Sequence, residues 1–216
     1  MEIKVYNFAG KRIPLFRYFL NECKTERNKK RPLIVFLHGA GERGGDPEKL
    51  FVHGLPKYIR QGRKIPAVVL APQCPEGYVW NQLTAELKEL IDVTVKEYDI
   101  DTDRISITGI SMGGYGTWEM GMSYPGFFSA LGPVCGGGLS WRSGLIGKTP
   151  VWAVHGDADT VVPPNNSIEM CDKLNSVGGR AELTILHGVA HNSWEFAYER
   201  TTIIDWLLAH KKSDNE

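Results

Sequence analysis

The chain has 216 residues, of which 42% are hydrophobic and 23% charged, a length that allows one substantial core and is short for two. Lysine and arginine together number 25, as do aspartate and glutamate, so the formal net charge is zero and no overall field favours nucleic acid or an anionic membrane. We therefore expect one domain over residues 1–216 that acts on a small or neutral ligand.

The N-terminus and the cysteines bear on location. Residues 1–5 lack the charged start and apolar stretch of a signal peptide, and no apolar run is long enough to span a membrane. The four cysteines are widely spaced, without the C-x-x-C pattern of a zinc or redox site. We expect reduced structural cysteines and a cytoplasmic protein that does not insert into membranes, or a secreted one if a leader was removed.

The chain begins with two short β-rich runs, at residues 3–8 and 13–20, on either side of a turn signal at residues 9–11. They predict an antiparallel hairpin. Further strands are predicted where apolar runs show no alternation, a pattern typical of strands covered on both faces: residues 33–37, 67–70, 105–110, 130–134, 151–154 and 183–186.

Helical patterns lie between or after these runs. They cover residues 48–60 (interrupted by Pro56), 83–98, 112–124, 167–177 and 194–210. Strands that alternate with helices predict a mostly parallel sheet with helices on both faces, preceded by the antiparallel hairpin. Only the short stretch 136–149 is available where a large lid would be inserted, so we expect an open site.

A nucleophile motif lies between the strand at 105–110 and the helix at 112–124. The residues Gly109-x-Ser111-x-Gly113 have the spacing of a nucleophile elbow, in which flanking glycines allow a sharp turn that exposes the serine hydroxyl. Five-residue matches also occur in ordinary turns, but the strand before and the helix after favour the functional interpretation. Ser111 is therefore the candidate nucleophile.

A serine nucleophile needs a histidine base, which is oriented by a carboxylate. Asp159 and His191 follow later predicted strands in the chain order serine, acid, histidine. Each has a rival nearby. We favour Asp159 over Asp157, which leaves the strand immediately and suits a turn, and His191 over His187, which lies close to a strand end.

The negative oxygen formed in acyl transfer requires hydrogen-bond donors, normally the N–H after the nucleophile and one from the loop after an earlier central strand. These are the N–H of Met112 and, in the loop of residues 38–41, the N–H of Ala40, with Gly41 as the second choice.

Two other sites are less well supported, and we expect no cofactor. His187 and His191, together with the nearby aspartates, resemble a metal site, but the histidines lie in a loop instead of sharing a helix face. Gly39-x-Gly41-x-x-Gly44 matches a dinucleotide fingerprint, yet no helix opens at once and no ribose-binding acid follows. The remaining histidines, His38, His53, His155 and His210, are expected to be packing or surface residues.

Four ordered motifs carry a family resemblance: Leu37-His38-Gly39, the Gly109–Gly114 elbow, His155-Gly156-Asp157-x-Asp159-x-x-Val162-Pro163, and Gly188-x-x-His191. Together they resemble the α/β-hydrolase superfamily. Residues 36–44, 71–75 and 191–194 are more narrowly similar to phospholipase/carboxylesterase-like esterases, which include feruloyl-esterase-like and poly(hydroxyalkanoate)-depolymerase-like proteins often labelled predicted peptidases. The resemblance covers nearly the whole chain and implies Ser111, Asp159 and His191 as nucleophile, acid and base.

These motifs together predict a serine carboxylesterase that hydrolyses small or aryl esters through an acyl-enzyme, on a small-molecule or polymer-borne substrate. A serine peptidase or amidase of the same fold is the alternative, and a non-catalytic binding protein is a third interpretation. Oligomeric state does not follow from the sequence. Candidates for contacting substrate, each with packing or charge pairing as its alternative role, are Glu42, Gln73, Trp80 and Trp194.

Overall fold

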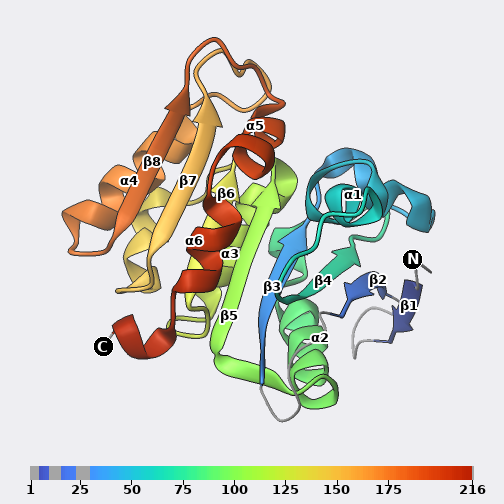
Figure 1. Cartoon of the computed structure of the whole chain (residues 1–216). Coiled ribbons are helices and arrows are strands. Elements are labelled where there is room, and N and C mark those ends of the chain that lie inside the picture. Colours follow the sequence, from blue (N-terminus) through green and yellow to red (C-terminus); the bar gives the residue numbers. More distant parts are fainter. Residues whose placement is uncertain (1–4, 10–15, 23–29, 216) are drawn as a thin grey trace.

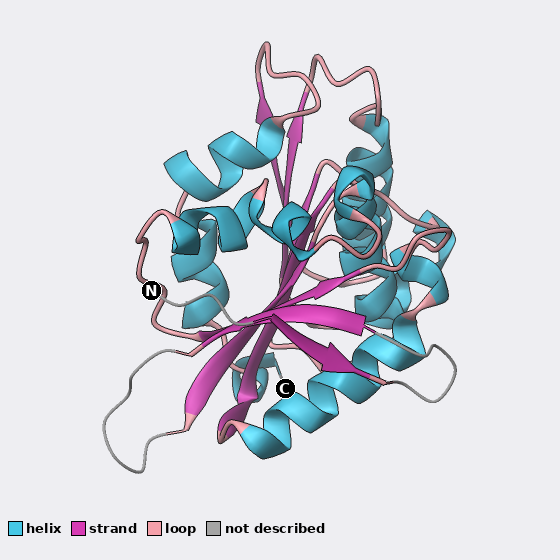
Figure 2. Ribbon diagram, turned by 90° about the vertical axis from the view of Figure 1, so that its right-hand side faces the viewer, coloured by secondary structure: helices cyan, strands magenta, loops and turns pink. Residues whose placement is uncertain are grey.

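The computed structural model describes residues 5–9, 16–22 and 30–215, which build one twisted eight-stranded sheet (Figures 1 and 2). The strand order is β1-β2-β4-β3-β5-β6-β7-β8. Strands β1 and β2 pair antiparallel, β2 runs antiparallel to β4, and all remaining neighbours are parallel. The strands are β1 (Val5–Phe8), β2 (Phe16–Asn21), β3 (Arg31–Leu37), β4 (Val68–Gln73), β5 (Ile100–Ile110), β6 (Ala130–Val134), β7 (Val151–Gly156) and β8 (Ala181–Leu186).

Six α-helices of the described chain cover the two faces of the sheet (Figure 2). They are α1 (Gly54–Arg60), α2 (Thr84–Glu97), α3 (Met112–Ser123), α4 (Asn165–Ser176), α5 (Ser193–Arg200) and α6 (Ile203–Ala209). Shorter 3-10 helices are η1 (Ala40–Glu42), η2 (Pro47–Phe51), η3 (Trp80–Gln82), η4 (Ser140–Ile146) and η5 (Lys212–Asn215). The predicted fold, a mostly parallel sheet with an N-terminal antiparallel hairpin, is confirmed.

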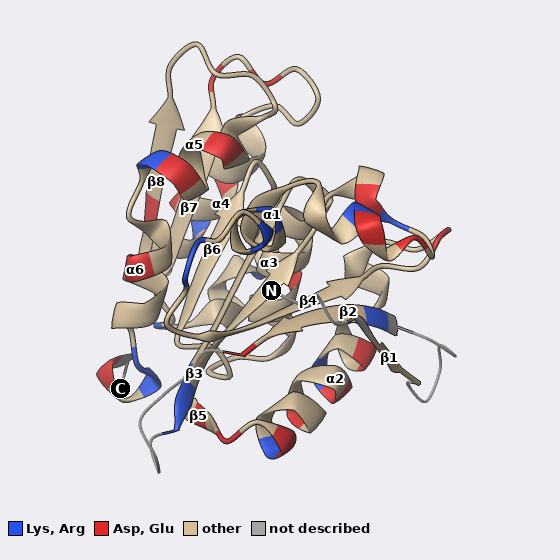
Figure 3. Ribbon diagram, turned by 45° about the vertical axis from the view of Figure 1, so that its right-hand side comes forward, with Lys and Arg blue, Asp and Glu red and all other residues tan. Residues whose placement is uncertain are grey.

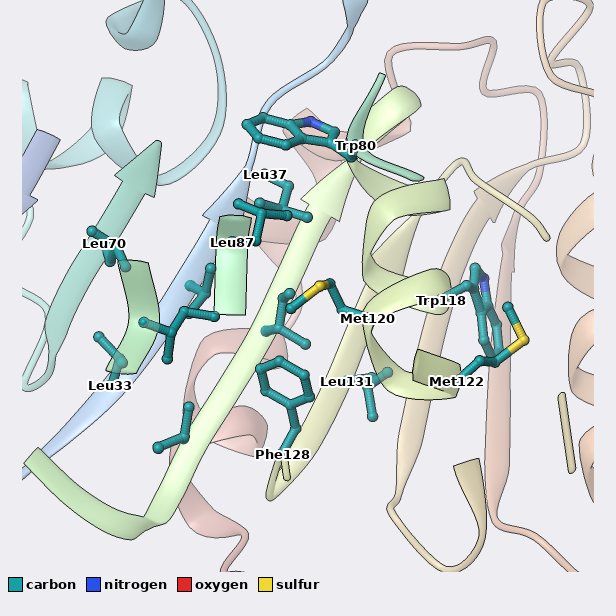
Figure 4. Close-up of a cluster of buried hydrophobic side chains, with 14 of the residues drawn as sticks. Leu33, Leu37, Leu70, Trp80, Leu87, Trp118, Met120, Met122, Phe128 and Leu131 are labelled. Carbon is teal, nitrogen blue, oxygen red and sulfur yellow. The ribbon is translucent and has the colours of Figure 1, made fainter. Parts of the chain in front are cut away.

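The core has two parts because successive side chains of a strand point to opposite faces. Leu33 and Val35 of β3 belong to the cluster under α2, α3 and α4, where Trp118 and Met120 are fully buried (Figure 4). Phe36 of β3 belongs to the cluster on the other face, under α1, α5 and α6. Both faces of the central strands are therefore buried, which explains their uninterrupted apolar sequences.

The helix predicted at residues 48–60 was expected to be interrupted at Pro56, and this position of the break is wrong. The structure has η2 and then α1, and the chain changes direction at Gly54, whose φ of +64° favours glycine. Pro56 lies inside α1, in its first turn, where a missing N–H removes no intrahelical bond. A Cβ at Gly54 would lie 2.1 Å from the ring of Phe36, so the glycine also allows α1 to approach β3 closely.

The helix predicted at 194–210 is divided into α5 and α6. The break falls at Thr201, which has an extended backbone. Its hydroxyl donates to the carbonyl of Ala197 and accepts from the N–H of Ile203 at 3.2 Å. These side-chain bonds replace backbone bonds of a continuous helix, as threonine often does at helix ends.

Other expectations have mixed outcomes. Cys23 and residues 10–11 of the predicted turn lie outside the described residues. Cys74, Cys135 and Cys171 are free and buried. Instead of a lid, the stretch 136–149 carries η4, which packs against α3 and α4. In the described part of the chain, no helix is both long and apolar enough to cross a bilayer. Acidic and basic residues are mixed over the elements in view in Figure 3.

The close packing of α3 against β3 depends on Gly113. A Cβ at this position would lie 1.9 Å from the carbonyl oxygen of Leu37 and 2.8 Å from that of His38. Backbone atoms cannot yield as a flexible side chain can, so α3 and the end of β3 would have to separate.

We therefore expect Gly113→Ala to lower the free energy of unfolding by more than about 3 kcal/mol, measured by urea denaturation. Gly41→Ala is the matched control, because no atom lies within 4 Å of a Cβ there, and its stability should stay near that of the wild type. Equal stability of the two variants would contradict the packing argument.

Candidate active site

Ser111 lies at the turn between β5 and α3, in a backbone conformation that is unusual for a residue with a side chain. Its φ is +52° and its ψ is −116°. The turn is held by hydrogen bonds from the Ser111 N–H to the carbonyl of Val134 at 2.9 Å and from the Tyr115 N–H to the Ser111 carbonyl at 3.1 Å. Such strain persists where the surroundings determine it fully, and this geometry is that of a nucleophile elbow.

The three residues predicted as nucleophile, acid and base form one hydrogen-bonded chain. The Oγ of Ser111 lies 2.9 Å from Nε2 of His191, and Nδ1 of His191 lies 2.7 Å from Oδ2 of Asp159. They come from three separate loops, after β5, β7 and β8. The structure thus brings together residues that are up to 80 positions apart in the sequence.

The carboxylate of Asp159 is buried and fully hydrogen-bonded. Its Oδ1 accepts the N–H groups of Val161 and Val162, each at 2.9 Å. Burial acts to raise the pKa of Asp159, but the hydrogen bond from His191 and those from the two backbone N–H groups outweigh it and hold the pKa below its usual value. The group therefore remains ionised at neutral pH and fixes the orientation of the imidazole.

His155, predicted as a packing residue, is buried directly beside Asp159. Its Nδ1 is 2.8 Å from the hydroxyl of Ser167, and its Nε2 is 2.9 Å from the carbonyl of Val162 and 3.3 Å from Oδ2 of Asp159. It supports the loop that carries the acid. The sequence signal was its place at the end of β7, four residues before Asp159.

The two rival residues pair with each other. Nδ1 of His187 lies 2.8 Å from Oδ2 of Asp157, and Oδ1 of Asp157 accepts the N–H of Gly188 at 2.7 Å. This second aspartate–histidine pair is on the surface, where the His187 side chain is 90% exposed. The hydrogen bond from His187 lowers the pKa of Asp157. The hydrogen-bonded chain of Ser111, His191 and Asp159 includes neither residue.

The loop after β3 contains the predicted oxyanion donor Ala40 and is held by the buried side chain of His38. Nδ1 of His38 donates to the carbonyl of Gly39 at 2.6 Å, and Nε2 accepts the N–H of Cys74 at 2.9 Å. Burial lowers the pKa of His38 to about 4, so this imidazole is neutral. Ala40 is exposed at the start of η1, and Met112 begins α3, where its N–H has no intrahelical partner.

Two of the four candidates for substrate contact support this loop instead. Trp80 is fully buried, and its indole N–H donates to the carbonyl of His38 at 2.9 Å. Gln73 is 1% exposed, and its amide nitrogen donates to the carbonyls of Glu42 and Asp46 at 3.0 and 2.7 Å. The structure thus gives Trp80 and Gln73 the packing role that was the alternative to substrate contact, because both side chains are buried and bonded to backbone carbonyls.

The other two candidates lie beside the chain of Ser111, His191 and Asp159. The Trp194 ring contacts that of His191, with centroids 5.3 Å apart. Oε2 of Glu42 and the Cβ of Ser111 both lie within 4 Å of the place where Gly39 would carry a Cβ. Sequence reasoning missed His53, whose ring contacts that of Trp194 at an interplanar angle of 56° with centroids 5.2 Å apart. An isolated histidine before a helix gives no signal of this contact.

A mainly apolar cavity of about 380 Å³ opens at Ser111. It is lined by Val79, Asn81, Ser111, Met112 and Tyr115. Its position next to the serine hydroxyl suits an apolar group of a bound molecule.

Among the described residues, one group of three could hold a metal: Cys135, Asp159 and His191. Burial raises the pKa of the Cys135 thiol to about 12, so it would have to lose a proton to become a good ligand. Asp159 and His191 already use their facing atoms in the hydrogen bond between them. The residues therefore fit a proton relay better than a metal site.

A mostly parallel sheet with a serine at the elbow after β5, an aspartate after β7 and a histidine after β8 defines an α/β hydrolase. Residues 76–202 match the model of the phospholipase/carboxylesterase family. The chain belongs to that family, as the sequence motifs implied.

Similar proteins of known structure or activity include esterases. A crystal structure of a thermostable esterase superposes with a TM-score of 0.86 at 33% identity and covers 97% of this chain and 63% of that chain. The bifunctional acetylxylan esterase/xylanase XynS20E of Neocallimastix patriciarum is 33% identical over 79 residues, 37% of this chain and 12% of the relative. Poly(3-hydroxyalkanoate) depolymerase C of Paucimonas lemoignei is 24% identical over 125 residues, with 43% and 30% coverage. The chain thus spans less than two thirds of each of these proteins.

The two aspartate–histidine pairs allow a direct test of the acid. We expect Asp159→Asn to lower kcat on a nitrophenyl ester by about 10³- to 10⁴-fold, because an amide does not hold the histidine in the required tautomer. Asp157→Asn should lower kcat by less than about fivefold, because Asp157 pairs with His187 at the surface, where such a pair contributes little. The reverse order would overturn the assignment of the acid.

Proposed function

We propose that the protein is a serine carboxylesterase that hydrolyses small or aryl carboxylic esters through an acyl-enzyme. The observation that carries the proposal is the continuous hydrogen-bonded chain from Ser111 through His191 to Asp159. A serine hydroxyl becomes nucleophilic when such a base removes its proton. The similarity to a thermostable esterase over 97% of the chain supports ester hydrolysis.

Acylation uses the atoms of this chain in order. His191 Nε2 takes the proton as the Ser111 oxygen forms a bond to the ester carbonyl carbon, and the carbonyl oxygen becomes negative. The N–H groups of Met112 and Ala40 are the proposed donors to that oxygen. His191 then gives its proton to the leaving alcohol, and the acyl group stays on Ser111.

Deacylation repeats the steps with water as the nucleophile. His191 takes a proton from water, the resulting hydroxide attacks the acyl carbon, and the acid is released as the serine oxygen regains a proton. The ionised Asp159 stabilises the imidazolium in both halves. The apolar cavity of Val79, Met112 and Tyr115 beside the serine suits the acyl group.

We expect Ser111→Ala to lower kcat/KM on a short-chain nitrophenyl ester by at least about 10⁴-fold and to abolish labelling by a fluorophosphonate probe. Circular dichroism should show an unchanged fold, because the φ of +52° is tolerated equally by either residue in this turn. Full activity of the variant would refute the proposal. A wild type that cleaves anilide peptides faster than esters would instead identify an amidase.

A further inference from the structure

Three buried polar atoms beside the nucleophile make no hydrogen bond of regular geometry in the described structure. They are Oε2 of Glu42, Nδ1 of His53 and Nε1 of Trp194. Buried polar atoms are normally paired, and each exception requires an explanation. We call these three residues the polar cluster.

One end of the polar cluster lies beside Ser111. Oε2 of Glu42 lies 3.1 Å from the Cβ position of Gly39, a point 3.7 Å from the Cβ of Ser111. Oε1 of Glu42 lies 3.8 Å from Nε2 of His53. The cluster therefore begins beside the nucleophile, on the loop that carries the oxyanion donor.

The other end of the polar cluster reaches the catalytic base. The Trp194 ring contacts both histidine rings, with centroids 5.2 Å from His53 and 5.3 Å from His191. The cluster thus follows the side of the site where His191 must give a proton to the leaving alcohol.

The elements that carry the polar cluster are fixed to each other. His53 immediately precedes α1, and Trp194 is in the first turn of α5. Lys57 of α1 and Glu195 of α5 form an ion pair at 3.5 Å. His53 and Trp194 thus come from the starts of two neighbouring helices that this ion pair links.

The chemistry of the three atoms selects the ligand. The indole N–H of Trp194 can only donate, whereas the carboxyl group of Glu42 offers an oxygen that accepts. An ammonium ligand would leave the indole N–H unpaired, and a carboxylate ligand would face Glu42. A hydroxyl group both donates and accepts, so it can pair with either kind of atom in the cluster.

Burial raises the pKa of Glu42, against the opposing effects of His53 and of the backbone N–H groups of Gly39 and Glu42. A carboxyl group that loses its hydration in this way gains more from a hydrogen-bond partner than an exposed one does. The burial of the Glu42 side chain thus strengthens the case for a ligand.

We propose that Glu42, His53 and Trp194 form a subsite for a hydroxyl group on the alcohol part of the ester, so that the enzyme prefers esters of hydroxyl-bearing alcohols. The acyl group then occupies the apolar cavity at Val79 and Met112. This inference rests on the proposed esterase function, because it divides the substrate at the ester bond that Ser111 attacks.

The test compares two pairs of esters of nearly equal shape. For the alcohol side, 2-hydroxyethyl butyrate is compared with propyl butyrate; for the acyl side, nitrophenyl 3-hydroxybutyrate is compared with nitrophenyl 3-methylbutyrate. We expect kcat/KM to favour the hydroxyl-bearing member of the alcohol pair by about tenfold or more, because its analogue leaves buried polar atoms unpaired. The acyl pair should differ by less than about threefold.

Variants locate the preference. Trp194→Phe removes the indole N–H and keeps an aromatic ring, and Glu42→Met removes the carboxyl group at similar length; each should reduce the tenfold preference to about twofold or less. Trp206→Phe and Glu48→Met are the matched controls, since Trp206 packs against Trp152 and Glu48 pairs with Arg60 at the surface. Both controls should keep the wild-type ratio.

The outcomes separate the subsite from the function. Hydrolysis of both esters of the alcohol pair at equal rates, with Ser111 still labelled by the fluorophosphonate, would overturn the subsite and leave the esterase proposal intact. A preference in the acyl pair alone would overturn its placement on the alcohol side. Unlabelled Ser111 and no hydrolysis of any ester would refute the esterase function and the subsite with it.

Discussion

The close approach of α3 to the ends of β3 and β6 is the constraint on which the site depends. Gly113 touches the Leu37 carbonyl so closely that no Cβ fits, and the Ser111 N–H is bonded to the Val134 carbonyl. Ser111 is thereby fixed to the two neighbouring strands as well as to its own. Because Leu37 leads directly into the loop of Ala40, the same contact that shapes the elbow also sets the distance between the nucleophile and the proposed oxyanion donor. The strain at Ser111 is held by this packing, as strained functional residues generally are.

Burial distinguishes two aspartate–histidine pairs that have the same chemistry and nearly the same spacing in the sequence. The side chains of Asp159 and His191 are 0% and 21% exposed. Those of Asp157 and His187 are 39% and 90% exposed. A hydrogen bond in the low-dielectric interior orients an imidazole strongly, whereas water competes for the same bond at the surface. His155 contributes to this difference, because its buried ring lies against the Asp159 carboxylate and both of its nitrogens are hydrogen-bonded.

The sequence allowed the sheet, the elbow and the order of the candidate catalytic residues to be predicted, because each follows from local patterns. Uninterrupted apolar runs mark strands covered on both faces, and the carboxyl ends of parallel strands meet at one edge. Three features could not be predicted because they do not follow from local patterns. The burial of Trp80, the helix break at Thr201 and the recruitment of His53 each depend on a partner more than a few residues away or on a side-chain bond that competes with the helix. Local propensity does not encode such partners.

The histidines near the nucleophile show how structural and ligand-directed roles differ in one small region. His38 uses both ring nitrogens within the protein, and burial keeps it neutral. His53 has a nitrogen without a partner, as do its neighbours Glu42 and Trp194. A fully bonded group rigidifies its loop, while an unbonded one retains its hydrogen-bonding capacity for another molecule. The loop after β3 is therefore held by the hydrogen bonds of His38. On the side toward α1 and α5 it borders polar atoms that have no hydrogen-bond partner. In the proposed subsite, the choice of alcohol therefore depends on side chains other than those of the Ser111, His191 and Asp159 chain.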